Sequence, residues 1–153
     1  MRVAVLVVGR PRDGAIASAV REYETRAARY WPLEVHEVRE ESARGLDAAL
    51  VKERAGARLL ARAGTGTLVA CDPGGIAMTS EAFASWLHGR REAAEDVAFA
   101  IGGAYGLSDA VRSRANRRLT LAPWTLPHEL ARLVLAEQLY RAGTIVRNEP
   151  YHK

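Results

Sequence analysis

The feature that most constrains the fold is an unbroken apolar run near the start of the chain, Val3–Val8 (Val-Ala-Val-Leu-Val-Val). An amphipathic helix or a half-exposed strand would interrupt such a run with polar residues at a regular interval. A run rich in β-branched residues is instead typical of a strand that is buried on both faces, as in a parallel sheet covered by helices. Further strands are expected at Leu33–Val38, Thr67–Cys71, Val97–Ile101 and Arg118–Leu121.

Segments with helical periodicity separate these expected strands. After the first strand, apolar residues recur at spacings of four and three from Ile16 to Tyr30. Later helices are expected over Leu46–Ala63, after a cap at Thr79 or Ser80, from Ser108–Asp109, and after Thr125 and Pro127. The last helix is expected to bury Leu126, Leu130, Leu133 and Val134. Alternating strands and helices predict an α/β fold, a mostly parallel sheet with helices on both faces, in one domain over residues 1–153.

Composition excludes several classes of protein. The chain is 48% hydrophobic and 26% charged, which is typical of a globular protein and not of a disordered one. The single cysteine, Cys71, excludes an internal disulfide and a cysteine-rich zinc cluster, so we expect no metal. No apolar run approaches the roughly 18–20 residues of a membrane span, and no signal peptide is evident, so we expect a cytoplasmic protein without a membrane partner. The net charge of +4 fits a nucleic acid partner without requiring one.

Three loops are candidates for ligand binding, because ligands of such sheets bind at the carboxyl ends of the strands. The loops are Asp72–Gly75, which is predicted to be a tight turn, Gly102–Leu107 and Ala122–Pro127. The glycines of the second loop either let a ligand approach the backbone or form a tight turn to a helix, and Gly106 permits a positive φ. The prolines of the third stiffen it, so that its N–H groups can bind a flat heterocycle, unless Trp124 simply fills the core.

Each of the polar candidates elsewhere in the chain has two possible interpretations, one functional and one structural. His128 is either an acid or base or a structural residue. Glu137 and Arg141 lie four apart on one helical face, which is most often a surface ion pair. Tyr151 and His152 can stack on a base or hydrogen-bond to one, unless the segment frays. A basic cluster can hold phosphates or simply be solvated; it comprises Arg112, Arg114, Arg117 and Arg118.

Taken together, these segments closely resemble the RlmH family, small bacterial methyltransferases of the SPOUT class that act on ribosomal RNA. The resemblance spans essentially the whole chain. Each matching segment is moderately specific, and their order and spacing are jointly strong. The segments are Val7–Gly9, Ile101–Leu107, Thr125–His128, Val134–Ala142 and Pro150–Lys153.

The resemblance implies a SPOUT-type fold whose C-terminal part threads a deep trefoil knot, and it implies a homodimer. It implies transfer of a methyl group from S-adenosylmethionine to N3 of a pseudouridine in large-subunit (23S) ribosomal RNA, on the assembled 70S ribosome. Cofactor contacts are implied at Cys71, Gly102, Leu121, Ala122, Pro123, Trp124, Thr125 and Leu126. The candidates for orienting or deprotonating the base, across the dimer interface, are Glu137, Arg141, Tyr151 and His152.

Two other functions stay open. One is a non-catalytic RNA-binding or ribosome-binding α/β module, and the other is an α/β protein that binds a different nucleotide. The glycine loop, the proline loop and the Tyr-His segment are all present, which favours the methyltransferase over a module that has lost its activity. Titration with S-adenosylmethionine and with other nucleotides would separate the methyltransferase from the third possibility.

Overall fold

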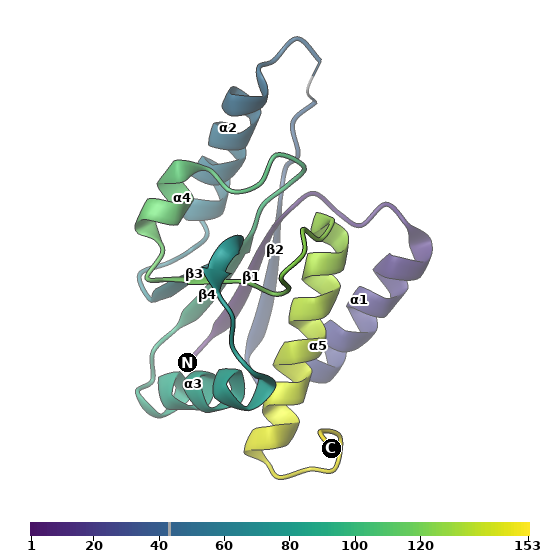
Figure 1. Cartoon of the computed structure of the whole chain (residues 1–153), viewed down its shortest axis with the longest axis vertical. Coiled ribbons are helices and arrows are strands. Elements are labelled where there is room, and N and C mark those ends of the chain that lie inside the picture. The colour runs from purple at the N-terminus through teal and green to yellow at the C-terminus, as the bar shows by residue number, and fades with distance from the viewer. Residues whose placement is uncertain (43) are drawn as a thin grey trace.

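The computed structural model describes residues 1–42 and 44–153, in which strands and helices alternate (Figure 1). The elements are β1 (Val3–Val8), α1 (Gly14–Ala27), β2 (Leu33–Val38), α2 (Ala48–Leu60), β3 (Thr67–Ile76), α3 (Ser80–Glu92), β4 (Val97–Ile101), α4 (Asp109–Arg114), β5 (Arg117–Leu119) and α5 (His128–Val146). The strands form a 5-stranded sheet in the order β2-β1-β4-β3-β5, and each neighbouring pair is parallel. The predicted α/β fold is therefore confirmed.

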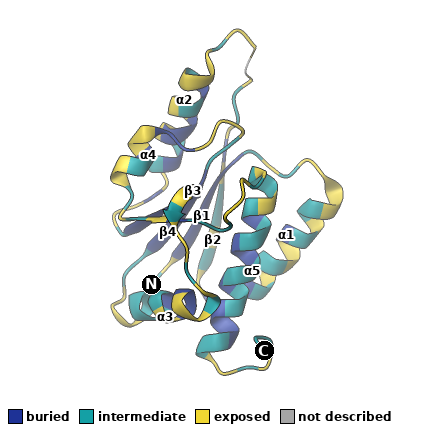
Figure 2. Cartoon of the chain, in the orientation of Figure 1, coloured by how far each residue is buried: buried dark blue, intermediate teal, exposed yellow. Residues whose placement is uncertain are grey.

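The sheet has a hydrophobic core on each face, which explains the unbroken apolar run of β1. Val3, Val5 and Val7 point into a core shared with α1, α3 and α5, whereas Leu6 and Val8 point into a second core shared with α2 and α4. Helices thus cover both faces, as predicted, and the strands are the most deeply buried layer (Figure 2). Strand β2 lies at the edge of the sheet, and most of its residues are only partly buried or exposed.

Side-chain caps set where the helices begin. Asp13, Asp47, Thr79 and Ser108 each accept a hydrogen bond from a backbone N–H in the first turn of the following helix. The cap at Asp47 explains why α2 begins at Ala48 and not at the predicted Leu46. Of the two caps predicted for α3, Thr79 is the one observed.

The predicted turn after β3 is wrong. The strand continues to Ile76, and both Cys71 and Ile76 pair with Leu119 of β5, so the residues between them bulge out of the sheet. A Cβ on Gly75 would lie 2.6 Å from the carbonyl carbon of Leu119, so only glycine permits this approach. Strand β5 is also shorter than predicted and ends at Leu119 instead of Leu121.

The predicted inner face of α5 is wrong as well. The helix buries Leu135, Leu139 and Ala142, whereas Leu130 is 36% exposed and Leu126 lies before the helix begins. The periodicity misled because α5 carries apolar residues on more than one side, so sequence alone does not select the buried one. Leu133 and Val134, which were also predicted to be buried, are only partly covered.

Two expectations concern the chain as a whole. The trefoil knot stays a prediction from the family resemblance, since strand order and pairing define the sheet and not the threading of the chain. Among the residues that the structure describes, no helix combines the length and the apolar composition needed to cross a membrane.

Candidate functional site

The three loops predicted to bind a ligand surround one cavity of about 420 Å³. They meet because β4, β3 and β5 are neighbours in the sheet and run in the same direction; the segment Asp72–Gly75 contributes Asp72 and Pro73 from the bulge within β3, and the other two loops follow β4 and β5. The volume is within the roughly 300–1,000 Å³ of small-molecule sites. The predicted cofactor contacts in the wall are Cys71, Gly102, Leu121, Ala122, Trp124, Thr125 and Leu126; Pro123 is outside it.

The glycine loop is shaped first by its own turn. A Cβ on Gly102 would lie 2.4 Å from the carbonyl carbon of Gly106, and the N–H of Gly106 donates a hydrogen bond to the carbonyl of Gly103 at 3.0 Å. Gly106 has the predicted positive φ, +80°. The interpretation as a tight turn is therefore confirmed; the turn also lines the cavity, and approach of a ligand to its backbone stays a prediction.

The proline loop forms the opposite wall. Trp124 is 79% exposed there, so the alternative in which its ring fills the core is wrong. The hydroxyl of Thr120 donates a hydrogen bond to the carbonyl of Ala122 at 2.5 Å, which tightens the loop entry. His128, the first residue of α5, also lines the cavity.

Cys71 is not a nucleophile in this environment. Burial raises the pKa of its thiol to about 12, so the thiolate is scarce at neutral pH. With so little thiolate, Cys71 acts as a small apolar side chain in the cavity wall.

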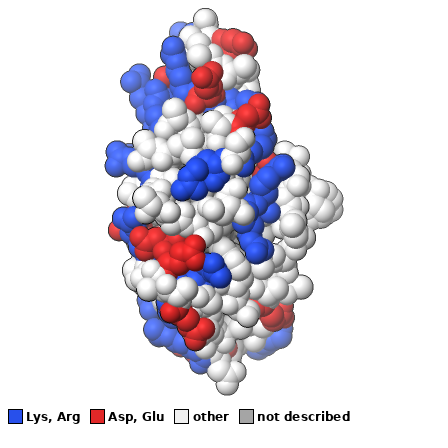
Figure 3. Space-filling view, turned by 90° about the vertical axis from the view of Figure 1, so that its left-hand side faces the viewer, with Lys and Arg blue, Asp and Glu red and all other residues white. Residues whose placement is uncertain are grey.

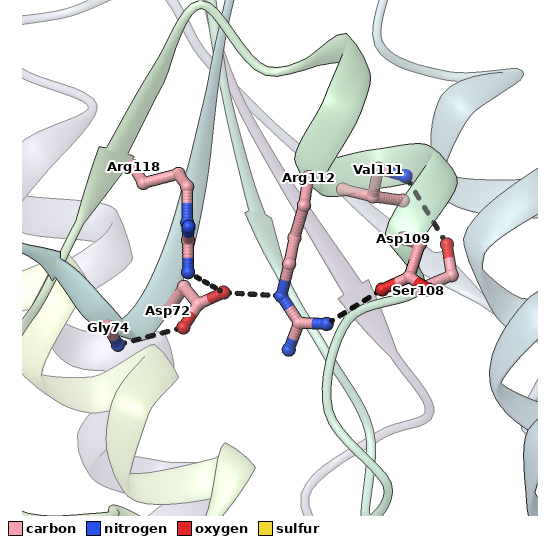
Figure 4. Close-up of polar contacts among 7 residues, drawn as sticks. All are labelled: Asp72, Gly74, Ser108, Asp109, Val111, Arg112 and Arg118. Atoms are coloured by element: carbon pink, nitrogen blue, oxygen red, sulfur yellow. Dashed lines mark hydrogen bonds and ion pairs between the residues drawn. The ribbon is translucent and has the colours of Figure 1, made fainter.

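Asp72 forms an ion-pair cluster at the edge of the cavity that sequence reasoning missed (Figure 4). Its buried carboxylate accepts hydrogen bonds from Arg112 Nε at 2.5 Å, from Arg118 Nη2 at 3.1 Å and from the N–H of Gly74 at 2.8 Å. Burial alone would raise the pKa of Asp72, but these hydrogen bonds and charges outweigh it and lower the pKa. The carboxylate is therefore ionised at neutral pH.

The predicted basic cluster is split by this arrangement. Arg112 and Arg118 converge on Asp72, whereas Arg114 contacts Asn116 at 3.3 Å and the guanidinium of Arg117 lies 5.2 Å from the centre of the Trp86 ring. On the side of the molecule that carries α4, basic and acidic side chains are interspersed (Figure 3). The four arginines thus do not form a single phosphate-binding surface.

The four residues predicted to act on the base lie together where the C-terminal segment packs against the second half of α5. Arg141 donates from Nε and Nη2 to Oε1 of Glu137, at 2.9 and 2.6 Å. The phenol of Tyr151 donates to the same oxygen, and Nδ1 of His152 lies 3.2 Å from Nη1 of Arg141. Nε2 of His152 lies 2.8 Å from Oε1 of Glu81, so the segment is docked and not frayed.

Two side chains of this cluster have raised pKa values and hold their protons. The hydrogen bond to Glu137 is the main cause of a raised pKa for Arg141. Desolvation, followed by hydrogen bonds with Tyr23 and Glu137, raises the pKa of Tyr151 far above its usual value. Arg141 and Tyr151 therefore keep their protons at neutral pH; the O–H of Tyr151 is donated to Glu137, whereas Arg141 has further N–H groups that a ligand can accept.

The cavity and this cluster are separate in one chain. A rise of ~1.5 Å per residue along α5 puts the Cα atoms of Ala131, in the cavity wall, and Glu137 about 9 Å apart, and those of His128 and Arg141 about 20 Å apart. Figure 1 shows the C-terminal segment at the end of α5 opposite to the loop that enters the helix. The structure thus assembles each predicted set of residues but does not bring the two sets together. In residues 1–42 and 44–153, no group of three or more His, Cys, Asp or Glu side chains is arranged to hold a metal.

Comparison with known proteins places the chain among methyltransferases. A family model described as a predicted SPOUT methyltransferase matches residues 1–152. A protein of Gemmatimonas aurantiaca named ribosomal RNA large subunit methyltransferase H is 64% identical over 154 residues, covering 100% of both chains. A protein of the same name from Geobacter sp. strain M21 is 44% identical over 99% of both. A solved structure described as a probable methylase family protein, from Haemophilus influenzae, shares the fold with a TM-score of 0.54 at 15% identity, over 99% of this chain and 70% of that one.

Proposed function

This chain belongs to the RlmH family of SPOUT methyltransferases, and on that premise we propose that it methylates large-subunit ribosomal RNA with S-adenosylmethionine as the donor. The proposed target is N3 of a pseudouridine on the assembled ribosome, in the cytoplasm. The names of the relatives support large-subunit ribosomal RNA as the substrate. The pseudouridine, its N3 atom and the assembled ribosome are what the family resemblance implies. The observation that carries the proposal is the single cavity enclosed by all three predicted loops.

The residues around the cavity fit an adenosyl group. Leu121, Leu126 and Cys71 contribute apolar surface, and the turn at Gly102 exposes backbone without a side chain to block it. Such a mixture of apolar surface and fixed backbone groups suits a flat heterocycle. When bound, S-adenosylmethionine supplies a methyl group already activated by its sulfonium, so the protein mainly has to align the acceptor and manage a proton.

The proton at N3 must leave as the methyl group is transferred. Arg141 stays protonated, so it can orient the base and stabilise negative charge that develops on it, while the O–H of Tyr151 holds Glu137 in place. Glu137 and His152 are then the candidates for accepting the proton. Both already contact Arg141, which would hold them next to the bound base.

The separation between these groups and the cavity supports a homodimer. Along α5, about 9 Å separates Ala131 in the cavity wall from Glu137, and about 20 Å separates His128 from Arg141, so in this proposal the cluster of a second protomer completes the site. The partly covered apolar side of α5, with Leu130, Leu133 and Val134, offers a surface for such a partner. A two-fold dimer would place two equivalent sites across this interface.

The experiment is mass spectrometry of ribosomal RNA from cells with and without the protein. We expect a pseudouridine that carries one extra methyl group only when the protein is present, and no modification when Glu137→Gln replaces it. Purified protein should methylate assembled ribosomes and not isolated large subunits. Ribosome binding without any methyl transfer would instead support the non-catalytic module.

A further inference from the structure

We infer that Arg112 binds the α-carboxylate at the methionyl end of the cofactor and thereby selects S-adenosylmethionine over nucleosides without that group. This inference rests on the proposed function, because it assigns a residue to the ligand of the same cavity. Arg112 belongs to α4, outside the three loops, and none of the predicted cofactor contacts includes it.

Arg112 is the cationic residue of the cavity. Among the described residues that line the wall, it is the only Lys or Arg; the other groups that can carry charge are Asp72, His128 and Cys71. The rest of the wall is apolar side chains, backbone and the hydroxyl residues Thr120 and Thr125. A guanidinium in such a wall needs a carboxylate to offset the solvation that it loses, and Asp72 is that partner for Arg112.

Asp72 fixes the direction of this guanidinium. It accepts the Nε–H of Arg112, and Nη1 lies 3.4 Å from the exposed Asp109, so two of the three guanidinium nitrogens face carboxylates of the protein (Figure 4). Nη2 has no hydrogen-bond partner among the described residues and lies 3.9 Å from where a Cβ of Gly106 would be. The two N–H groups of Nη2 are therefore held beside the glycine turn that lines the cavity. A planar guanidinium presented in this way suits a carboxylate.

The charges of the cofactor select which part of it can lie there. S-adenosylmethionine carries a positive sulfonium and a positive ammonium, both of which a guanidinium repels, and one negative carboxylate, which it attracts. Asp72 does not remove this preference, because its single negative charge is shared between Arg112 and Arg118. Asp109 also faces Arg112, at 3.4 Å, but its side chain is 97% exposed and its charge is screened by solvent, so the less exposed part of the cluster, two arginines and Asp72, keeps a positive balance at this edge of the cavity.

The same geometry argues against an RNA phosphate as the main ligand of Arg112. Arg118, which shares the aspartate, is outside the cavity wall and is the more exposed of the two arginine side chains, 46% against 32%. Arg118 is thus the better placed of the pair for a ligand that approaches from solvent. Arg112 is turned toward a space that admits a small molecule.

Calorimetry with three ligands tests the inference on the purified protein. The ligands are S-adenosylmethionine, its decarboxylated form, and 5′-methylthioadenosine, which lacks the whole amino acid end. We expect the wild-type protein to bind S-adenosylmethionine about tenfold more tightly than the decarboxylated form, as a charge-assisted hydrogen bond at a partly exposed site would give.

Variants assign that preference to a residue. Arg112→Gln should weaken binding of S-adenosylmethionine about tenfold and leave binding of the decarboxylated form unchanged or stronger, so that the preference disappears. Arg112→Lys should keep part of it, because the charge remains but the fork is lost. Arg114→Gln is the matched control on the same helix, and should bind all three ligands as the wild type does.

The outcomes separate this inference from the proposed function. Equal binding of the two forms by the wild type, or an intact preference in Arg112→Gln, would overturn the inference while leaving the cofactor cavity in place. Unchanged cofactor binding in Arg112→Gln together with weaker ribosome binding would assign Arg112 to RNA and also overturn it. A wild-type protein that binds none of the three ligands would contradict the proposed function itself, and the inference with it.

Discussion

The phenol of Tyr151 donates a hydrogen bond of 3.0 Å to Oε1 of Glu137, which joins the C-terminal segment to the middle of α5. The ring of Tyr151 also lies 4.5 Å from the ring of Tyr140, and the guanidinium of Arg141 lies 4.8 Å from it. These contacts preform the cluster within the chain before any substrate arrives. The segment is therefore a rigid part of the proposed catalytic apparatus, although it lies far from the cavity of its own chain.

Deletion of residues 150–153 should leave cofactor binding unchanged and abolish methylation of ribosomes. The deletion removes Tyr151 and His152 but touches no residue of the cavity wall. Calorimetry with S-adenosylmethionine and transfer of labelled methyl groups to ribosomes measure the two effects. Deletion of the exposed Lys153 alone is the control and should be active. Full activity of the longer deletion would exclude this segment from the mechanism.

Gly102→Val should abolish binding of S-adenosylmethionine in a protein that still folds. The added Cβ meets the backbone of Gly106 and Leu107 at 2.4 to 2.7 Å, so the turn that lines the cavity must open. Calorimetry checks the binding and circular dichroism checks the fold. Gly89→Ala, in α3 where a Cβ meets nothing within 4 Å, is the control and should bind normally. Normal binding by Gly102→Val would show that the cofactor binds elsewhere.

The strands could be predicted from the sequence where burial constrains every residue to be apolar. Every residue of β1 and β4 faces a core on one side of the sheet or the other, so their apolar runs marked both strands to the residue. The loops at the carboxyl ends of the strands followed from the parallel sheet. That three of them share one cavity depends on the strand order, which no local pattern contains.

What was missed depends on contacts between distant residues. Asp72 was interpreted as part of a turn, yet its structural role comes from Arg112 and Arg118, which lie 40 and 46 residues further along the chain. The buried side of α5 was mistaken because a helix that is apolar on two sides gives no local signal for which one meets the sheet. The cofactor and catalytic roles themselves stay predictions.

Cys71 should resist alkylation in the folded protein. Its pKa is raised from the usual 9.0 to about 12 by burial. A rise of this size lowers the thiolate fraction at pH 8 by about 1000-fold. Iodoacetamide should therefore leave native protein unlabelled at pH 8 and label it fully in urea, as mass spectrometry would show. Rapid labelling of the native protein would contradict this.

The sign of the same shift gives a pH dependence of stability. Between pH 9 and 12 the unfolded thiol loses its proton while the folded one keeps it, so the folded state binds more protons there. The free energy of unfolding should fall as pH rises through this window. The fall should be smaller in Cys71→Ala, which has no thiol to ionise, when urea unfolding is measured at pH 8 and pH 10.

Arg132→Met should destabilise the protein strongly without involving the cavity. Arg132 is buried and donates to both oxygens of Glu24, at 2.7 and 3.2 Å, and to Glu37 at 2.9 Å, which joins α5 to α1 and β2. Its loss leaves two carboxylates without their main partner, which costs about 3 kcal/mol. Urea unfolding measures this. Arg10→Met is the control, because Arg10 also pairs with Glu37 but is largely exposed, and little change is expected.

A mixture of two inactive variants should recover activity if the site is shared between protomers. Gly102→Val keeps an intact cluster on α5, and the chain without residues 150–153 keeps an intact cavity. In a mixed dimer, one of the two sites then combines the intact cavity with the partner's intact segment. Random assortment gives about half mixed dimers, and hence about a quarter of wild-type methylation. Each variant alone should be inactive, and a co-expressed mixture that stays inactive while forming mixed dimers would show that each chain completes its own site.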